Sequence, residues 1–322
     1  MSKLYTLALI FILFSCDSRR IVSNDDTIFV DYDKEQIFDW NNTILIKSVV
    51  SLETADDCVL SYARKCLVSG KYIVYHDEKQ KAIFVFDEEG TFLYVIDAVG
   101  GGPDEYTEIK DMAISCDKEF ILVLDNNSVV SFDLKNGRFQ DRISLPQNIA
   151  SNFYRFANVD KQTFYFWSTE KENSLYLYEN GEMKVIEKRT GFPFVCQKFY
   201  YDSENSLNYI SDYGLFEIHG LEQERVRKKY SFDFGYLNFS KSQMPKNVTE
   251  FEQVDDDESF KCIMSAFETD DDLFIMTVSP DGMLYNICLD KITHEVRAGK
   301  QDENAPLLVI DAVGRYFYGI IY

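Results

Sequence analysis

One type of apolar strand recurs along the chain, and its spacing constrains the fold more than any other feature. Each occurrence is marked by one apolar residue, and the markers are Ile73, Ile121, Phe164, Leu207, Phe274 and Phe317. The steps between successive markers are 48, 43, 43, 67 and 43 residues. A period in the forties with several strands in each unit is typical of β-propeller blades. The spacing therefore predicts an all-β chain, a six-bladed β-propeller.

The pattern inside each unit agrees with blades. A second strand follows the marker strand at residues 82–87, 128–133 and 174–178, and a turn with Gly90, Gly137 or Gly181 follows it. Glycine adopts positive φ at hairpin corners without steric cost. The 21 Tyr and 26 Phe residues favour strands. The charged segment 220–229 is interpreted as a further hairpin.

The long step of 67 residues predicts an inserted loop at residues 238–259, which carries the acidic run 255–258. At the other end of the chain, residues 307–310 and 316–321 offer only two strands for the last blade. We expect the N-terminal stretches 27–32 and 44–52 to supply its outer strands, because such closure would cover an exposed sheet edge.

The N-terminus has the pattern of an export signal. Lys3 precedes an apolar run at residues 4–14, which is too short to span a bilayer. The sequence Leu13-Phe14-Ser15-Cys16 resembles a bacterial lipobox, in which the cysteine is lipidated. This predicts a signal peptide at 1–15, a lipidated tether at 16–27 and the propeller domain at 28–322. The alternative is an ordinary signal peptide with a cysteine there by chance.

The charge balance limits the class of partner. Asp and Glu number 54 against 33 Lys and Arg, a formal net charge of −21. Such a surface repels nucleic-acid phosphates and anionic membrane faces. Solubility is the simplest explanation of the charge, and binding of a cation or of a basic partner is the alternative.

The six cysteines after Cys16 are scattered and lack zinc-site spacing. Cys58 and Cys66 form the one plausible local pair for a disulfide. A domain of this size does not need such bridges, so we expect buried free thiols.

Few residues point to catalysis. The three histidines, His76, His219 and His294, fall in different repeats, and no nucleophile elbow or phosphate loop is present. We therefore expect no catalytic or metal residues, and name Arg64, His76 and His219 as the candidates for a site in the central funnel. Acidic hairpins such as 87–90 and 270–272 leave calcium as an alternative cofactor, although Asp and Gly are common in turns.

A motif after the first blade resembles a known family. Gly100-Gly101-Gly102-Pro103-Asp104-Glu105-Tyr106 is similar to the Gly-x-Gly-Pro-Gly-Glu-Tyr signature of the six-bladed propeller lipoproteins of Bacteroidetes, relatives of NHL-repeat propellers. Segments 50–54 and 211–218 resemble two further motifs of that family. Asp104 departs from the pattern, where the family has glycine. We expect Gly100, Gly102, Pro103, Glu105 and Tyr106 to form a structural turn between blades.

The resemblance implies a role in the cell envelope. Such proteins are outer-membrane lipoproteins that face the periplasm or the cell surface. For this chain it implies a monomeric module, held to the membrane through the lipid on Cys16, that binds a protein or glycan partner without catalysis. Some related NHL-type propellers are lyases or lactonases. A metal-dependent hydrolase or lyase with a site in the central funnel is therefore the alternative.

Overall fold

The computed structural model describes residues 27–33, 36–56, 58–240, 242, 244–253, 259–302 and 307–321. The predicted signal peptide, Cys16 and the tether up to residue 26 lie outside the described residues, as does the acidic run 255–258. Within the described ranges, no helix is long and apolar enough to cross a membrane.

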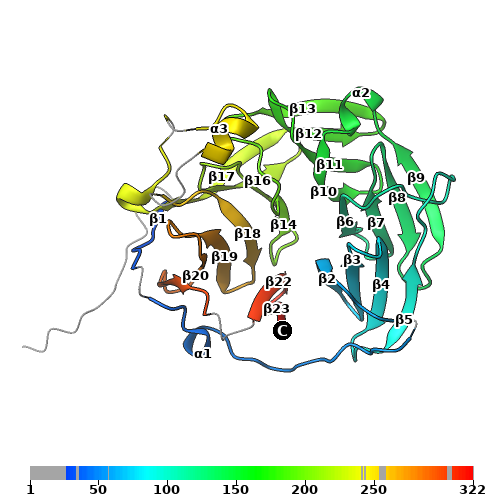
Figure 1. Ribbon diagram of the computed structural model, residues 1–322, viewed down its shortest axis with the longest axis horizontal. Helices are drawn as coiled ribbons and strands as arrows, with labels where there is room; N and C mark the ends of the chain where they lie inside the picture. The colour runs from blue at the N-terminus through cyan, green and yellow to red at the C-terminus, as the bar shows by residue number, and fades with distance from the viewer. Residues whose placement is uncertain are drawn as a thin grey trace, which may run out of the picture.

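Five four-stranded antiparallel blades follow one another along the chain and surround a central channel (Figure 1). Blade 1 consists of β2 (Ala63–Ser69), β3 (Tyr72–Asp77), β4 (Ala82–Asp87) and β5 (Phe92–Ile96). Blade 2 consists of β6 (Asp111–Ile114), β7 (Phe120–Leu124), β8 (Ser128–Asp133) and β9 (Phe139–Ser144). Blade 3 consists of β10 (Phe153–Asp160), β11 (Thr163–Ser168), β12 (Asn173–Glu179) and β13 (Glu182–Lys188).

Blades 4 and 5 continue the same order of strands. Blade 4 consists of β14 (Phe199–Tyr201), β15 (Leu207–Ile210), β16 (Glu217–Glu222) and β17 (Arg225–Asp233). Blade 5 consists of β18 (Ile263–Glu268), β19 (Asp272–Val278), β20 (Leu284–Asp290) and β21 (Val296–Lys300). The charged segment 220–229 forms the hairpin between β16 and β17, as predicted.

The prediction of six complete blades is wrong. The propeller has five blades, and a two-stranded sheet of β22 (Leu307–Val313) and β23 (Tyr316–Ile321) stands where the sixth was expected. β22 lies beside β18 of blade 5 and β2 of blade 1, so the innermost strands still form a closed ring. Figure 1 shows β22, in red, between these two strands.

The predicted closure of the last blade by N-terminal strands is also wrong. β1 (Thr27–Phe29) instead pairs in parallel with β17 and becomes a fifth strand of blade 4. Ile28 is buried there in the cluster that contains Phe232. Further along, Phe38 is buried against Phe274, and its N–H donates to the carbonyl of Lys300 in blade 5. Burial of these apolar side chains explains why the N-terminal segment follows blades 4 and 5.

Residues 44–52 form no strand. They leave the short helix α1 (Trp40–Thr43) and run along the outside of the molecule to blade 1 (Figure 1). At the far end the N–H of Glu53 donates to the carbonyl of Gly90, while Leu45, near the start of the segment, is 92% exposed. Between these two points the segment passes β23, where the Lys47 ammonium donates to the Tyr316 hydroxyl at 2.9 Å. This exposed segment is called the strap below.

The core lies between neighbouring blades. The middle strands are buried on both faces, as in β4, where Ile83, Val85 and Phe86 are fully covered. Separate apolar clusters fill the spaces between blades 1 and 2, 2 and 3, 3 and 4, and 4 and 5. Continuous apolar runs in the sequence therefore mark strands that lie between two other sheets.

The described part of the predicted insertion folds against blade 4. It contains α3 (Val248–Gln253), whose Phe251 stacks on Phe192 with ring centroids 4.6 Å apart. The six described cysteines are free thiols, and Cys58 and Cys66 are not joined. Five of them are buried, as expected, whereas Cys116 is exposed.

Candidate functional site

The central channel is the candidate site. Its wall consists of the innermost strands β2, β6, β10, β14, β18 and β22, each of which lies beside the next. A cavity of about 1370 Å³ runs along this channel. A space of this size is large enough for several sugar rings or a short peptide, and such sites commonly lie at the centre of a β architecture.

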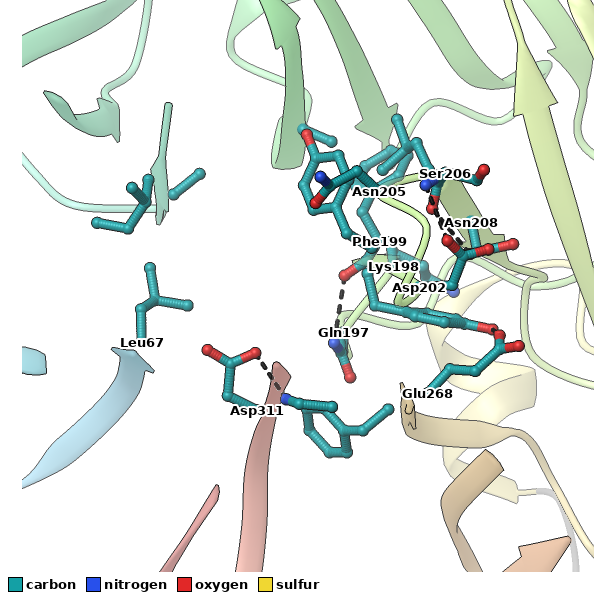
Figure 2. Close-up of a pocket in the computed structure, with 18 of the residues that line it drawn as sticks. Leu67, Gln197, Lys198, Phe199, Asp202, Asn205, Ser206, Asn208, Glu268 and Asp311 are labelled. Atoms are coloured by element: carbon teal, nitrogen blue, oxygen red, sulfur yellow. Dashed lines mark hydrogen bonds between the residues drawn. The ribbon is translucent and has the colours of Figure 1, made fainter. Parts of the chain in front are cut away.

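The wall of the channel is mainly apolar in its middle. Leu67, Phe199 and Phe267 line it from three different strands. Figure 2 shows Leu67, Phe199 and Asp311 around the same open space. Two buried polar atoms of the lining, the Asn208 side-chain oxygen and the Ser265 hydroxyl, have no hydrogen-bond partner. Each atom is covered by the surrounding protein, so neither is open to a ligand in the channel.

The charge of the lining differs from that of the whole chain. Ten Lys and Arg residues line the cavity against seven Asp and Glu residues, whereas acidic residues greatly outnumber basic ones in the sequence. The channel is therefore basic inside an acidic protein. Like charges grouped in a cleft focus the electric field and attract ions of opposite charge.

Most of the excess positive charge gathers where the innermost strands begin. We call this end the basic mouth, and define it by Arg64, Lys65, His76, Lys110, Asp111 and Arg155. The Lys65 ammonium lies 2.7 Å from the Asp111 carboxylate, whose other oxygen accepts the N–H of Phe156. Asp111 thus joins blades 1, 2 and 3.

Two further cations of the mouth, Arg155 and Lys110, also have contacts with the protein. The Arg155 guanidinium donates to the backbone carbonyls of Cys196 and Lys110, at 2.8 and 3.2 Å. The Lys110 ammonium donates to the Ser151 carbonyl at 2.9 Å, and burial lowers the pKa of this lysine. Arg155 therefore fixes the geometry of blades 2 to 4 around the opening.

Arg64 and His76 complete the mouth. The nearest carboxylate to Arg64 is that of Glu78, at 4.0 Å, and the Arg64 side chain is 42% exposed. His76 is only 3% exposed, yet it lines the cavity. Burial lowers the pKa of His76 to about 4, with Arg64 and Lys65 adding to the effect and Asp111 opposing it. The imidazole is therefore neutral at neutral pH.

Asp311 lies deeper in the channel, on β22. Its carboxylate accepts the N–H of Val68 at 3.0 Å and that of Ala312 at 2.8 Å. Burial raises the pKa of Asp311 to about 6, although both N–H groups and the charge of Lys65 favour the ionised form. The carboxyl group thus changes its charge in mildly acidic solution.

The opposite mouth holds a compensated network of charges. Buried Glu268 accepts hydrogen bonds from Tyr200 at 3.1 Å and Lys229 at 2.9 Å, and lies 3.0 Å from Lys291. Lys229 also contacts Asp202, at 2.8 Å. Figure 2 shows Asp202 and Glu268 on the same side of the cavity. This network joins blades 4 and 5, and within it each charged side chain lies next to one of opposite charge.

The structure separates the residues predicted for the funnel. Arg64 and His76 both line the channel at the basic mouth. His219 lies on β16, 3.3 Å from the Glu217 carboxylate and against Tyr209, and does not line the cavity. His294 lies in the turn between β20 and β21 with φ +61°.

The predicted turn motif lies between blades 1 and 2. The Glu105 carboxylate accepts the N–H of Gly102 at 2.7 Å. Tyr106 is fully buried, and its hydroxyl donates to the carbonyls of Lys81 and Ile96. A Cβ atom at Gly100 would lie 1.9 Å from the Glu105 carboxylate, so a side chain there would displace this carboxylate. Arg142 donates to the carbonyl of Pro103 at 3.1 Å.

The residues that sequence reasoning missed are charged groups at strand ends. Asp111 begins the innermost strand β6, and Glu268 ends the innermost strand β18. Their positions at strand ends, counted from the repeat, were the sequence signal that could have identified them. Among the described residues, no group of three or more His, Cys, Asp or Glu side chains is placed to hold a metal ion.

Two solved structures resemble this architecture. A Bacteroides fragilis protein described as a "putative exported protein" superimposes with a TM-score of 0.66 at 17% identity, over 85% of this chain and 80% of that one. A member of the DUF4221 family from Bacteroides vulgatus gives 0.53 at 12% identity, over 77% and 83%. These likenesses support the fold alone. No curated protein matches the sequence.

A family model matches residues 26–319, nearly the whole of the propeller. The family is described as a domain of unknown function, DUF4934. Because the match covers all five blades and most of the two-stranded sheet, this chain belongs to the DUF4934 family.

Proposed function

We propose that this protein is an extracytoplasmic, lipid-anchored binding module that holds a glycan or protein partner in its central channel without catalysis. The observation that carries the proposal is the cavity of about 1370 Å³ inside the ring of innermost strands. Its apolar wall, together with the charged side chains at its two mouths, is the combination that ligand sites present.

The location rests on two observations. The sequence Leu13-Phe14-Ser15-Cys16 resembles a lipobox, which supports attachment to the outer membrane through Cys16. The similar propeller from Bacteroides fragilis is described as exported. A single lipid chain gives weak, reversible attachment, so a lipoprotein with several chains would stay on the membrane surface. The proposed module acts there as a monomer.

The placement of the histidines favours binding over metal-dependent hydrolysis or lysis. A catalytic metal site needs several ligands that converge on one point. His76 lines the channel, whereas His219 and His294 lie at two other places in blades 4 and 5. The polar groups that do converge at the basic mouth, Lys65 and Asp111, are already bonded to each other.

The test combines a ligand screen with a blocked channel. The full chain in detergent is screened by thermal shift against neutral and acidic oligosaccharides and short peptides, since a ligand of the folded state raises the melting temperature. Leu67→Trp then places a larger side chain in the channel, and Leu93→Trp on the exposed outer strand β5 is the control. We expect loss of binding in the first variant only. Equal binding by both variants would place the ligand outside the channel.

A further inference from the structure

The basic mouth contains one cation, Arg64, whose charge is only weakly balanced by a nearby carboxylate. The Arg64 guanidinium is 4.0 Å from Glu78, a side chain that is itself half exposed, and has no shorter ion pair among the described residues. Lys65, beside it on β2, is held by Asp111. Ion pairs of the Arg64–Glu78 kind contribute little in water, so Arg64 is available to another anion.

His76 provides a second, independent observation. Its side chain is more than nine-tenths buried and lines the cavity, yet the imidazole has no hydrogen bond to any residue that the structure describes. It lies directly across from Lys65 in the pairing of β2 with β3. A neutral imidazole has one N–H donor and one acceptor nitrogen. The donor is unused, and the charges around it are those of Asp111, Arg64, Lys65 and Asp77.

We propose that the basic mouth binds the carboxylate or sulfate group of an acidic glycan. Arg64 supplies positive charge to the anion, and His76 donates a hydrogen bond. The proposal rests on the function proposed above, and names the chemical class of its ligand. Hydrogen bonds in which one partner is charged are roughly twice as strong as neutral ones, so this contact would orient the glycan in the channel.

The rest of the channel favours a saccharide over an acidic peptide. Beyond the mouth, the uncharged polar side chains of Ser203, Asn205 and Ser206 line the cavity, and each can both donate and accept hydrogen bonds. Sugar hydroxyl groups both donate and accept, and they recur on every ring. The apolar faces of sugar rings match the wall formed by Leu67, Phe199 and Phe267.

The experiment uses the full chain in detergent and four probes: a galacturonate tetrasaccharide, a sulfated tetrasaccharide, neutral maltotetraose and a tetraglutamate peptide. Calorimetry compares the native protein with Arg64→Ala. Arg138→Ala is the matched control, because Arg138 is an exposed arginine on the outer side of blade 2. We expect Arg64→Ala to weaken binding of the acidic saccharides about tenfold, the usual loss for a hydrogen bond to a charged group. Neither variant should change binding of maltotetraose.

Salt and unfolding measurements complete the test. Raising sodium chloride from about 50 to about 300 mM should weaken acidic binding to the native protein more than to Arg64→Ala, because screening acts on the added charge. A melting temperature like that of Arg138→Ala shows that Arg64→Ala is folded. His76→Phe gives a second variant of the same site, because it keeps an aromatic ring and removes the N–H donor.

The outcomes distinguish failure of the anion site from failure of the binding module. Binding of maltotetraose as tight as that of the acidic saccharides would overturn the anion site and keep the binding module. Equal binding of tetraglutamate would overturn the choice of a glycan. Unchanged acidic binding in both Arg64→Ala and His76→Phe would place the anion elsewhere. No binding of any saccharide or peptide would overturn both proposals.

Discussion

The backbone N–H of Val68 donates to the side-chain carboxylate of Asp311 at 3.0 Å, and this bond joins the last described sheet to the first blade. Val68 lies on β2 and Asp311 on β22, 243 residues apart. Ala312 donates to the other carboxylate oxygen. A propeller must join its two ends, and here a buried side chain contributes to that junction.

Asp311→Asn should change how stability depends on pH. The pKa of Asp311 is raised to about 6 in the folded protein, above its ordinary value near 4. The folded state therefore holds the proton more tightly, so the contribution of Asp311 is full below about pH 4 and is lost as pH rises through 6. Between these pH values, the contribution of Asp311 to the free energy of unfolding changes by at most about 3 kcal/mol. Urea unfolding from about pH 4 to 7 should show a smaller loss of stability in Asp311→Asn than in the native chain.

Asp104→Asn, at an exposed turn position, is the control for this measurement. It should follow the native pH dependence. If Asp311→Asn also follows it, Asp311 does not titrate between these pH values.

A pair of glycine variants tests how the strap is attached. Gly90 and Gly181 occupy equivalent outer turns of blades 1 and 3, with φ +88° and +90°. A Cβ atom at Gly90 would lie 2.3 Å from the Ser51 carbonyl, whereas nothing lies within 4 Å of one at Gly181. Gly181→Ala should cost about 1 kcal/mol from positive φ alone. Gly90→Ala should cost about 3 kcal/mol, because the strap must move as well.

Hydrogen exchange would locate the change. The N–H of Glu53 donates to the Gly90 carbonyl, and the N–H of Phe92 donates to the Glu53 carboxylate, each at 2.8 Å. Both amides should exchange faster in Gly90→Ala than in Gly181→Ala. Equal protection in the two variants would show that the strap is not held at Gly90.

The repeat in the sequence predicted the propeller because each blade hides both faces of its middle strands. That burial requires continuous apolar runs, such as β4 and β7, at a regular period. The number of blades was harder to predict. The Phe317 marker belongs to a two-stranded sheet, and a marker strand shows where a unit begins but not how many strands complete it.

The course of the N-terminal segment could not be predicted from its own residues. An outer strand can pair with any open sheet edge, since backbone groups are the same everywhere. The choice depends on tertiary contacts such as Phe38 with Phe274, and on Gly299, where a Cβ atom would lie 2.5 Å from the Phe38 nitrogen. Contacts of this kind join residues far apart in the chain.

The candidate site was predictable only in part. Arg64 and His76 could be predicted as candidates, because they lie on the first innermost strand β2 and on its neighbour β3. Both line the channel. His219 was also named as a candidate, but it lies in the third strand of its blade, away from the channel. The pairing of Lys65 with Asp111 joins different blades, so only the packing of the blades brings these charges together.

Asp77 should stabilise blade 1 through the hydrogen bonds that it accepts. It is fully buried, and its carboxylate accepts the Ser61 hydroxyl at 2.7 Å and the N–H groups of Tyr62 and Gln80. Burial opposes its ionisation, but the hydrogen bonds from Ser61 and Gln80 outweigh burial and lower the pKa of Asp77. Its stabilisation is thus present above the ordinary pKa and is lost as pH falls.

Asp77→Ala should lower the free energy of unfolding by about 3 kcal/mol at neutral pH, since several donors lose their acceptor. Asp87→Ala is the comparison, because Asp87 accepts the N–H groups of Glu89 and Thr91 in an exposed turn. It should cost about 1 kcal/mol. Urea unfolding of both variants measures the difference, and equal losses would mean that burial does not strengthen the contribution of Asp77.

Asp212 should be the most sensitive carboxylate between blades 3 and 4. It lies 2.5 Å from Arg189 and 3.4 Å from the fully buried Lys198, and accepts the indole N–H of Trp167 at 2.7 Å. Asp212→Asn removes the negative charge but keeps the size of the side chain, which leaves two buried cations without compensation. Breaking a buried ion pair in this way costs about 3–5 kcal/mol. Exposed Asp141→Asn should cost less than about 0.5 kcal/mol. Denaturation followed by tryptophan fluorescence and circular dichroism compares the two, and a loss in Asp212→Asn no larger than in Asp141→Asn would show that other groups balance the buried cations.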